Sequence, residues 1–220
     1  MTPDVSIWNT LAAYQTDFWS GLVGTPFSDA SVGGSVAVGT GDSTHPGVVV
    51  GSTSTSSTGV GAALTSITAV TLGGAAWVNE WLVRVPTLST VAQEYIVRVG
   101  MIDSVSTDAT DGVYFEYDRL TSGDVWRCKT ASAASRTGTA TTTAIVAGAW
   151  ARLSLVVNAG GTQADFYVDG ALAASLTATI PTGSGKETGF GFTIIKSAGT
   201  TARTLEIDRA LWRASLSTPR

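Results

Sequence analysis

The sequence is poor in charged residues, cysteine and histidine. Of its 220 residues, 14% are charged, whereas soluble domains average about 25%. Because Cys128 is the only cysteine, the chain cannot form an internal disulfide and lacks the cysteine set of a zinc site. Because His45 is the only histidine, a metal site or catalytic scheme that needs two imidazoles is excluded as well.

Long apolar runs and basic stretches are also absent. No stretch approaches the roughly 20 consecutive apolar residues that a membrane-spanning helix needs, so we expect no membrane partner. The N-terminus has neither the basic nor the apolar region of a secretory signal peptide. The net charge of −4 argues against nucleic-acid binding, which normally uses a basic surface.

What the sequence does have is the alternation of apolar and polar residues that is typical of β-strands. In 77–85, the apolar side chains that begin with Trp77 share one face, and Glu80 and Arg84 share the other. The Asp-Gly pair at 169–170 predicts a two-residue hairpin turn, because both turn positions need positive φ. The same patterns predict further strands at 95–103, 113–118, 125–130, 150–158, 164–168, 171–176, 190–196 and 204–212.

Short strands at this spacing, separated by Gly, Ser and Thr turns, predict an all-β fold: a two-sheet antiparallel β-sandwich or jelly roll. We expect residues 46–220 to form this sandwich and residues 1–45 to be an N-terminal segment, an arm or first strands packed on it. That segment either begins as a short helix capped by Asp4 or is extended chain packed on the sandwich. The low-complexity stretch 51–61 is expected to be a mobile loop or a linking turn, and 120–124 a hairpin loop.

The N-terminal segment is dense in aromatic residues. We favour the interpretation that they seal one end of the sandwich, and the alternative is an anchoring arm that contacts a partner. If they do contact a partner, the residues to test first are Trp8, Tyr14, Phe18 and Trp19.

Several motifs occur in a consistent order along most of the chain. They are TDF at 16–18, HPGVV at 45–49, DGVYFEYD at 111–118, GAWARL at 148–153 with NAGGT at 158–162, FYVDG at 166–170, and IIKSAGT at 194–200 followed by LEID at 205–208. Together they resemble the β-sandwich modules of tailed-phage virion proteins in the concanavalin A-like (laminin G-like) jelly-roll group. Within that group, a freestanding chain without a fibre shaft is most similar to the capsid decoration type.

The resemblance implies a non-enzymatic virion structural protein on the outer head surface, which stabilises the capsid lattice and needs no cofactor. Its partners would be the major capsid protein and further copies of itself in a homotrimer, and it would be made in the host cytoplasm. The alternative is a receptor- or glycan-binding module of a tail fibre or tailspike, with a cell-surface glycan as partner. A glycan-cleaving enzyme of the same group is the third reading. The low charge suits a subunit that is packed in an assembly.

Catalytic carboxylates are the first requirement of the enzyme reading. Retaining glycosidases need two carboxyl groups about 5–5.5 Å apart. The resemblance implies that the enzymes of this group would carry them in a Glu-x-Asp-x-Glu motif on one strand face. The chain offers EYDRL at 116–120 and EIDRA at 206–210, where Leu120 and Ala210 stand in the place of the last carboxylate. We therefore predict that both acidic pairs are solvated strand faces beside an arginine, and we expect no catalytic residues.

Other single residues have structural interpretations as well. His45 precedes a Pro-Gly turn, where a loop hydrogen bond is the favoured role. Cys128 lies in a predicted strand, where it is expected to be a small buried residue. Asp103, Asp108 and Asp111 share one polar loop, for which a solvated loop is favoured over a calcium site, and no metal is predicted.

Tryptophans on strands are the remaining candidates for ligand contact. The resemblance implies that sugars would bind on a concave sheet, with an exposed aromatic ring as a stacking platform. Core filling is the default for a tryptophan on an alternating strand. The candidates are Trp77, Trp81, Trp126 and Trp150.

Overall fold

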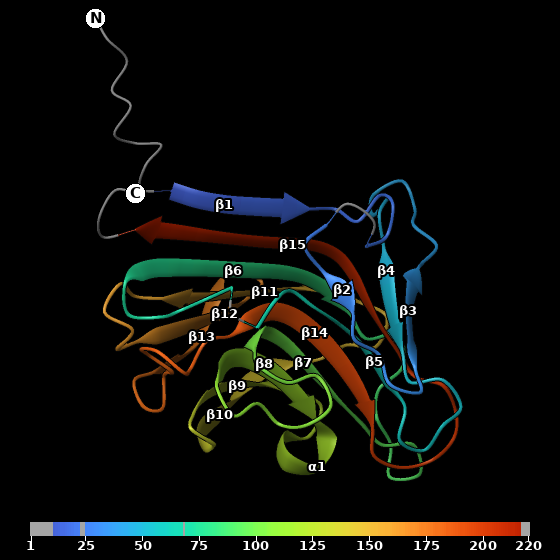
Figure 1. Cartoon of the computed structure of the whole chain (residues 1–220). Helices are drawn as coiled ribbons and strands as arrows, with labels where there is room; N and C mark the ends of the chain where they lie inside the picture. The colour runs from blue at the N-terminus through green and yellow to red at the C-terminus, as the bar shows by residue number, and fades with distance from the viewer. Residues whose placement is uncertain (1–10, 23–24, 68, 217–220) are drawn as a thin grey trace, which may run out of the picture.

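The computed structural model describes residues 11–22, 25–67 and 69–216 of the chain. These residues form fifteen β-strands and one short helix. Two antiparallel sheets lie face to face (Figure 1), which confirms the predicted all-β sandwich. In this part of the chain, no helix has the length and apolar character to cross a membrane.

The first sheet has eight strands. They are β1 (Leu11–Thr16), β3 (Ser35–Val38), β4 (Val49–Ser52), β6 (Ala75–Arg84), β11 (Trp150–Val157), β12 (Ala164–Val168), β13 (Ala171–Leu176) and β15 (Thr204–Leu216). Their order is β13-β12-β11-β6-β15-β4-β3, with β1 also paired to β15. The predicted turn at 169–170 joins β12 to β13, and both of its residues have positive φ, 51° at Asp169 and 85° at Gly170.

The second sheet has seven strands. They are β2 (Ser28–Asp29), β5 (Val60–Leu64), β7 (Tyr95–Ile102), β8 (Gly112–Asp118), β9 (Val125–Ser132), β10 (Ser135–Ala144) and β14 (Gly189–Lys196). Their order is β10-β9-β8-β7-β14-β5-β2. A single helical turn, α1 (Arg119–Ser122), lies between β8 and β9 where a hairpin loop was expected, because the Asp118 side chain accepts the Leu120 N–H and caps it.

Strand β15 connects three neighbours in the first sheet. It pairs with β6 along most of its length, with β4 over its first residues, and with β1 from Ala210 onward. Between Ile207 and Arg209 the register with β6 shifts by one residue, which leaves Asp208 as a bulge. The bulge therefore lies where the partner on the other side of β15 changes from β4 to β1.

The N-terminal segment is part of the sandwich. Residues 11–16 form β1 and lie along β15 (Figure 1), so the extended alternative is correct for them and a helix is wrong. Asp4, the predicted helix cap, lies outside the described residues. Strands β2 and β3 also belong to this segment and pair with β5 and β4. The low-complexity stretch is a linking turn at 53–59, and its ends belong to β4 and β5.

The core fills the space between the sheets with aromatic and aliphatic side chains. Trp81 and Trp126 are buried in it, as the core interpretation of these residues predicts. Phe115 of β8 meets Phe166 of β12 edge to face, with ring centroids 5.2 Å apart, so the contact joins the two sheets. Cys128 is buried as predicted, and burial raises the pKa of its thiol to about 12, which leaves it unreactive.

Candidate functional site

The four aromatic residues predicted as partner contacts have different surroundings. Trp8 lies outside the described residues. Phe18 is 1% exposed and belongs to the core, and the Tyr14 ring is stacked on Trp212 with centroids 4.4 Å apart. Trp19 is 73% exposed. Of the three described residues, Trp19 therefore offers the largest free surface to a partner, and the sealing interpretation fits the other two.

An apolar groove lies beside β1, at the end of the sandwich where Trp212 meets Phe190. We call it the aromatic groove, and its volume is about 360 Å³. None of the described residues that line it carries a charge. The lining residues are Ala12, Ala13, Pro26, Thr65, Ser66, Ala69, Trp77, Phe190 and Trp212.

Strands from both sheets position the aromatic wall of this groove. Trp212 of β15 is in register with Tyr14 of β1, and its indole is stacked on Phe190 of β14 with centroids 4.6 Å apart and an interplanar angle of 16°. Trp77 of β6 lies against the same Phe190 ring at 5.8 Å. The wall is thus held by packing across the sandwich and by the pairing of β1 with β15.

The indole N–H of Trp77 is a polar group without a partner. Its Nε1 atom is buried and makes no hydrogen bond within the described residues. A buried donor left unsatisfied costs about 1–3 kcal/mol, so a ligand oxygen or a water molecule that reached it would relieve this cost. Trp77 was among the tryptophans singled out from the sequence, whereas Phe190 and Trp212 were not.

Trp150 and His45 form a second cluster, on the outer face of the first sheet. The two rings are stacked with centroids 4.5 Å apart, and the Arg84 guanidinium lies 4.6 Å from the Trp150 ring centre. His45 Nδ1 is 2.9 Å from a carboxylate oxygen of the bulged Asp208. The predicted hydrogen bond of His45 is present, and its partner is a strand carboxylate. Trp150 is covered by these neighbours and is a poor stacking platform.

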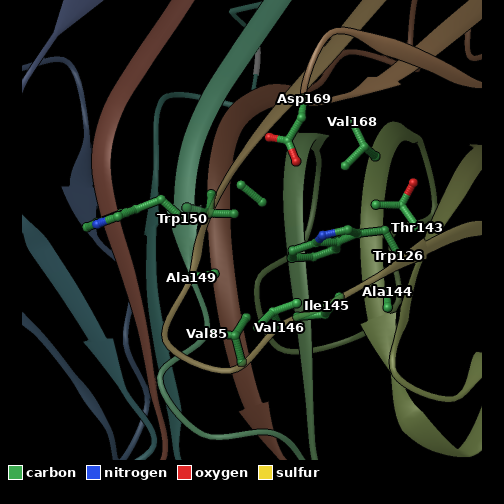
Figure 2. A pocket seen from close by; sticks show the side chains of 12 residues that line it. Val85, Trp126, Thr143, Ala144, Ile145, Val146, Ala149, Trp150, Val168 and Asp169 are labelled. Carbon is green, nitrogen blue, oxygen red and sulfur yellow. The ribbon is translucent and has the colours of Figure 1, made fainter.

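A small cavity of about 80 Å³ lies between the sheets beside Trp126. Figure 2 shows the Trp126 indole among the lining side chains, while the Trp150 side chain points away. Ligand pockets usually measure about 300–1,000 Å³. This cavity is therefore too small for a sugar, and the aromatic groove is the better candidate site.

The acidic pairs do not behave as solvated strand faces, so that prediction is wrong for two of their four residues. Glu116 is 2% exposed and accepts hydrogen bonds from Arg98 Nε at 2.8 Å and Lys129 Nζ at 3.0 Å. Asp208 is 7% exposed and bonded to His45. The physical reason is that the partners come from other strands or loops. Side chains on the same face of adjacent strands lie about 4.5–5.5 Å apart, whereas consecutive side chains of one strand point to opposite faces.

The other two acidic residues also have structural partners. Glu206 forms an ion pair with Arg84, its cross-strand neighbour on β6, where an adjacent arginine was expected. Asp118 accepts hydrogen bonds from the Leu120 N–H and the Thr121 hydroxyl at the start of α1. The four carboxylates are therefore engaged in separate structural contacts.

The three aspartates of the loop 103–111 do not converge on one point. Asp103 accepts hydrogen bonds from the backbone N–H groups of Thr110 and Asp111, both at 3.0 Å. Asp111 accepts the Ala133 N–H, and Asp108 contacts cations on the neighbouring strands. Within the described residues, no group of three or more histidine, cysteine or acidic side chains is placed to hold a metal ion.

Solved structures of similar shape are lectin-like sandwiches. A protein of unknown function, SO2946 from Shewanella oneidensis MR-1, matches with a TM-score of 0.69 and 18% identity over 98% of this chain and 91% of that one. Peanut lectin matches with a TM-score of 0.66 and 16% identity over 94% and 99%. The Emp47p carbohydrate recognition domain matches with a TM-score of 0.59 and 10% identity over 92% and 96%. These likenesses establish a concanavalin A-like fold.

Sequence comparison identifies a family. No curated protein sequence matches the chain significantly. Residues 44–208 match the family model described as SO2946-like, C-terminal domain. The match begins next to His45 and ends at Asp208, the two residues joined by the hydrogen bond at the bulge. Because it covers three quarters of the 220 residues, the chain belongs to the SO2946-like C-terminal domain family.

Proposed function

We propose that this protein is a non-enzymatic recognition module that binds a neutral glycan in the aromatic groove. The observation that carries the proposal is a wall of Trp77, Phe190 and Trp212 beside a buried indole N–H that lacks an acceptor among the described residues. Aromatic rings pack on the apolar faces of sugar rings, and the N–H becomes a donor for a sugar oxygen when the bound sugar displaces the side chains that cover it. The uncharged lining favours a neutral sugar.

The size of the groove and the fold support the same proposal. A volume of about 360 Å³ lies within the usual range of small-molecule sites. One of the similar structures is named a lectin and another a carbohydrate recognition domain. A fold alone does not establish a function, so the main support for glycan binding is the structure of the groove.

The state of the carboxylates supports the non-enzymatic part of the proposal. Glycoside hydrolysis needs two carboxyl groups that face one scissile bond. Here Glu116 is buried between two cations, Glu206 is paired with Arg84, and Asp208 is bonded to His45. None of the three is left free to act as a nucleophile or as a proton donor.

The proposal predicts that Trp77→Phe weakens glycan binding by about twofold to tenfold. The variant keeps an aromatic ring but removes the N–H, and one hydrogen bond is worth about 0.5–1.5 kcal/mol, or up to roughly tenfold in affinity. A glycan array first identifies the neutral oligosaccharide that binds, and titration calorimetry then compares the variants. Trp77→Ala, which also removes the ring, should lose more.

Trp19→Ala is the matched control for this test, because it removes an exposed indole away from the groove lining. It should bind the same oligosaccharide as tightly as the wild type. A blank array, or equal affinities for wild type and Trp77→Phe, would contradict the proposal.

A second candidate function is a structural subunit of a virion surface, as the motif resemblance implies. The observation that favours it is a pair of exposed apolar side chains, Trp19 and Val38, which we call the apolar patch; Val38 belongs to β3, the outermost strand of the first sheet. A hollow of about 310 Å³ is lined by Val38 together with Leu22 and Val36, which are partly buried against the core. Trp19 and Val38 are 73% and 63% exposed. Under this candidate the patch packs against another copy in a trimer on the capsid, and the protein is made in the host cytoplasm.

This candidate predicts that the wild type sediments as a trimer and that Trp19→Glu sediments as a monomer. A carboxylate in the centre of an apolar contact must be desolvated without a partner, which costs several kcal/mol. Sedimentation velocity at micromolar concentration measures the change, and Val91→Glu, at another exposed apolar position, is the control that should stay trimeric. A wild-type protein that sediments as a monomer would rule out self-association through the patch.

A further inference from the structure

The loop 103–111 lies against the outer face of the second sheet. Its backbone is anchored at several points: Val105 O accepts the Thr193 hydroxyl at 2.6 Å, and Thr107 O accepts the Arg98 guanidinium at 3.2 Å. The Asp103 carboxylate closes the base of the loop through two backbone N–H groups. The loop therefore has several anchors besides the Asp108 side chain.

The Asp108 carboxylate lies among three cations and a phenol from four adjacent strands. It accepts hydrogen bonds from Lys129 Nζ and the Tyr114 hydroxyl, whereas the Nε–H groups of Arg98 and Arg136 donate to Glu116 and to the Ala109 carbonyl and pair with Asp108 by charge alone. Arg98 Nε of β7 is 3.1 Å away, Lys129 Nζ of β9 is 2.8 Å away, and Arg136 Nε of β10 is 3.0 Å away. The Tyr114 hydroxyl of β8 donates to it at 2.7 Å. Three cations and a phenol thus converge on one carboxylate.

The charges on the strands are not balanced without this carboxylate. The strands supply three cations, Arg98, Lys129 and Arg136, and one anion, Glu116. The Arg98 and Lys129 side chains are only 6% exposed, so water screens their charge poorly. Asp108, from the loop, supplies a second anion, and its side chain is 30% exposed. The cations are fixed in the framework, and the anion enters from the solvent side.

We propose that this cluster is a binding site for the carboxylate of an acidic sugar, and that Asp108 occupies it as an internal ligand. Rotation of the Asp108 side chain would release its carboxylate to solvent while the loop stays anchored by its backbone. An external carboxylate would then accept hydrogen bonds from Lys129 and the Tyr114 hydroxyl and pair by charge with Arg98 and Arg136. The site is on the opposite sheet face from the core and is independent of the aromatic groove.

The electrostatics of the cluster favour an ionised carboxylate. Burial alone would raise the pKa of Asp108, but the hydrogen bonds from Lys129 and Tyr114 and the charge of Arg98 outweigh it and lower that pKa below its ordinary value. Burial raises the pKa of Tyr114, so its hydroxyl remains a hydrogen-bond donor at neutral pH. An acidic sugar, ionised at neutral pH, presents the same group as the aspartate.

The test is calorimetric titration of the full chain with glucuronate, acetate and glucose. The Asp108→Ala variant should bind glucuronate about tenfold or more tightly than the wild type, because the internal competitor is gone. Binding of glucuronate but not glucose identifies the carboxylate as the recognised group. Equal binding of acetate and glucuronate would show that the site accepts any small carboxylate, and would overturn the inference that its ligand is an acidic sugar. Asp29→Asn, an exposed carboxylate on β2, is the control and should match the wild type.

Two results would overturn the whole proposal. One is a folded Asp108→Ala variant that binds no carboxylate at roughly 10 mM ligand. The other is equal affinity of wild type and Asp108→Ala for glucuronate, which would mean that the aspartate does not compete with the ligand for the cluster. If Asp108→Ala does not fold, Asp108→Asn keeps the shape of the side chain and is titrated instead. Since these ligands and variants leave Trp77 untouched, the result is separate from the groove test.

Discussion

Replacement of Trp81 by alanine is expected to lower the free energy of unfolding by about 3–5 kcal/mol. The side chain is completely buried, and its ring meets Phe27 and Phe192 edge to face at 5.7 and 6.2 Å. Its Nε1–H donates to Asn79 Oδ1 at 2.7 Å. The variant opens a cavity between the sheets and also leaves the buried Asn79 amide without this donor. Urea unfolding followed by circular dichroism measures the change.

The control for Trp81→Ala is Trp19→Ala. Both remove an indole, but Trp19 is exposed, so its removal should change the free energy of unfolding by no more than about 0.5 kcal/mol. Trp81→Phe should fall between the two, since it keeps part of the ring volume and loses the hydrogen bond. A loss below about 1 kcal/mol for Trp81→Ala would contradict the assignment of Trp81 to the centre of the core.

Replacement of Glu116 by alanine is expected to cost about 3–5 kcal/mol, since removal of one partner of a buried ion pair leaves the other charges uncompensated. Here Arg98 and Lys129 both lose a carboxylate that lies within 3.0 Å of each, and Asp108 is left as their remaining anion. The carboxylate also lies beneath the loop 103–111, where water cannot easily replace it. The same urea titration at neutral pH measures the loss.

The matched control for Glu116 is Asp29→Asn on β2, an exposed carboxylate that accepts a single backbone N–H. Its effect should stay within about 0.5 kcal/mol. The conservative variant Glu116→Gln should be destabilised less than Glu116→Ala if hydrogen bonding carries part of the effect, and equally if charge alone does. A Glu116→Ala variant as stable as wild type would mean that the cluster does not depend on this carboxylate.

The strand pattern is the part of the fold that local sequence determines well. The alternation in 77–85 corresponds to β6, and the Asp-Gly pair at 169–170 forms the turn it predicts. Both signals are local, because side-chain period and turn conformation depend on a few consecutive residues. The helical turn α1 was missed, although Asp118, its cap, was visible in the sequence. A four-residue helix has no periodicity that could reveal it.

The candidate sites were visible only in part, because each one combines residues from distant segments. Trp77 could be singled out as a tryptophan on a strand, but its neighbours in the groove come from β14 and β15. Alternation assigns a residue to one face of its strand and does not tell which strands from the other sheet lie opposite.

For Glu116, the predicted strand face was correct but the predicted exposure to solvent was wrong. Alternation correctly placed it on the side away from the core, and that side was taken to be solvent. The loop 103–111 covers it and makes a second buried layer, whose polar members must then be paired to be tolerated.

The scarcity of charge, cysteine and histidine, together with the strand pattern, was enough to determine an all-β sandwich and to leave few candidates for catalysis. Those conclusions depend on composition and on contacts between near neighbours in the chain. The tertiary structure decided where the few charged residues are used and which aromatic side chains meet. His45 reaches Asp208 across 163 positions, and Phe190 reaches Trp212 from the other sheet. Such contacts follow from the order and register of the strands, which side-chain period alone does not specify.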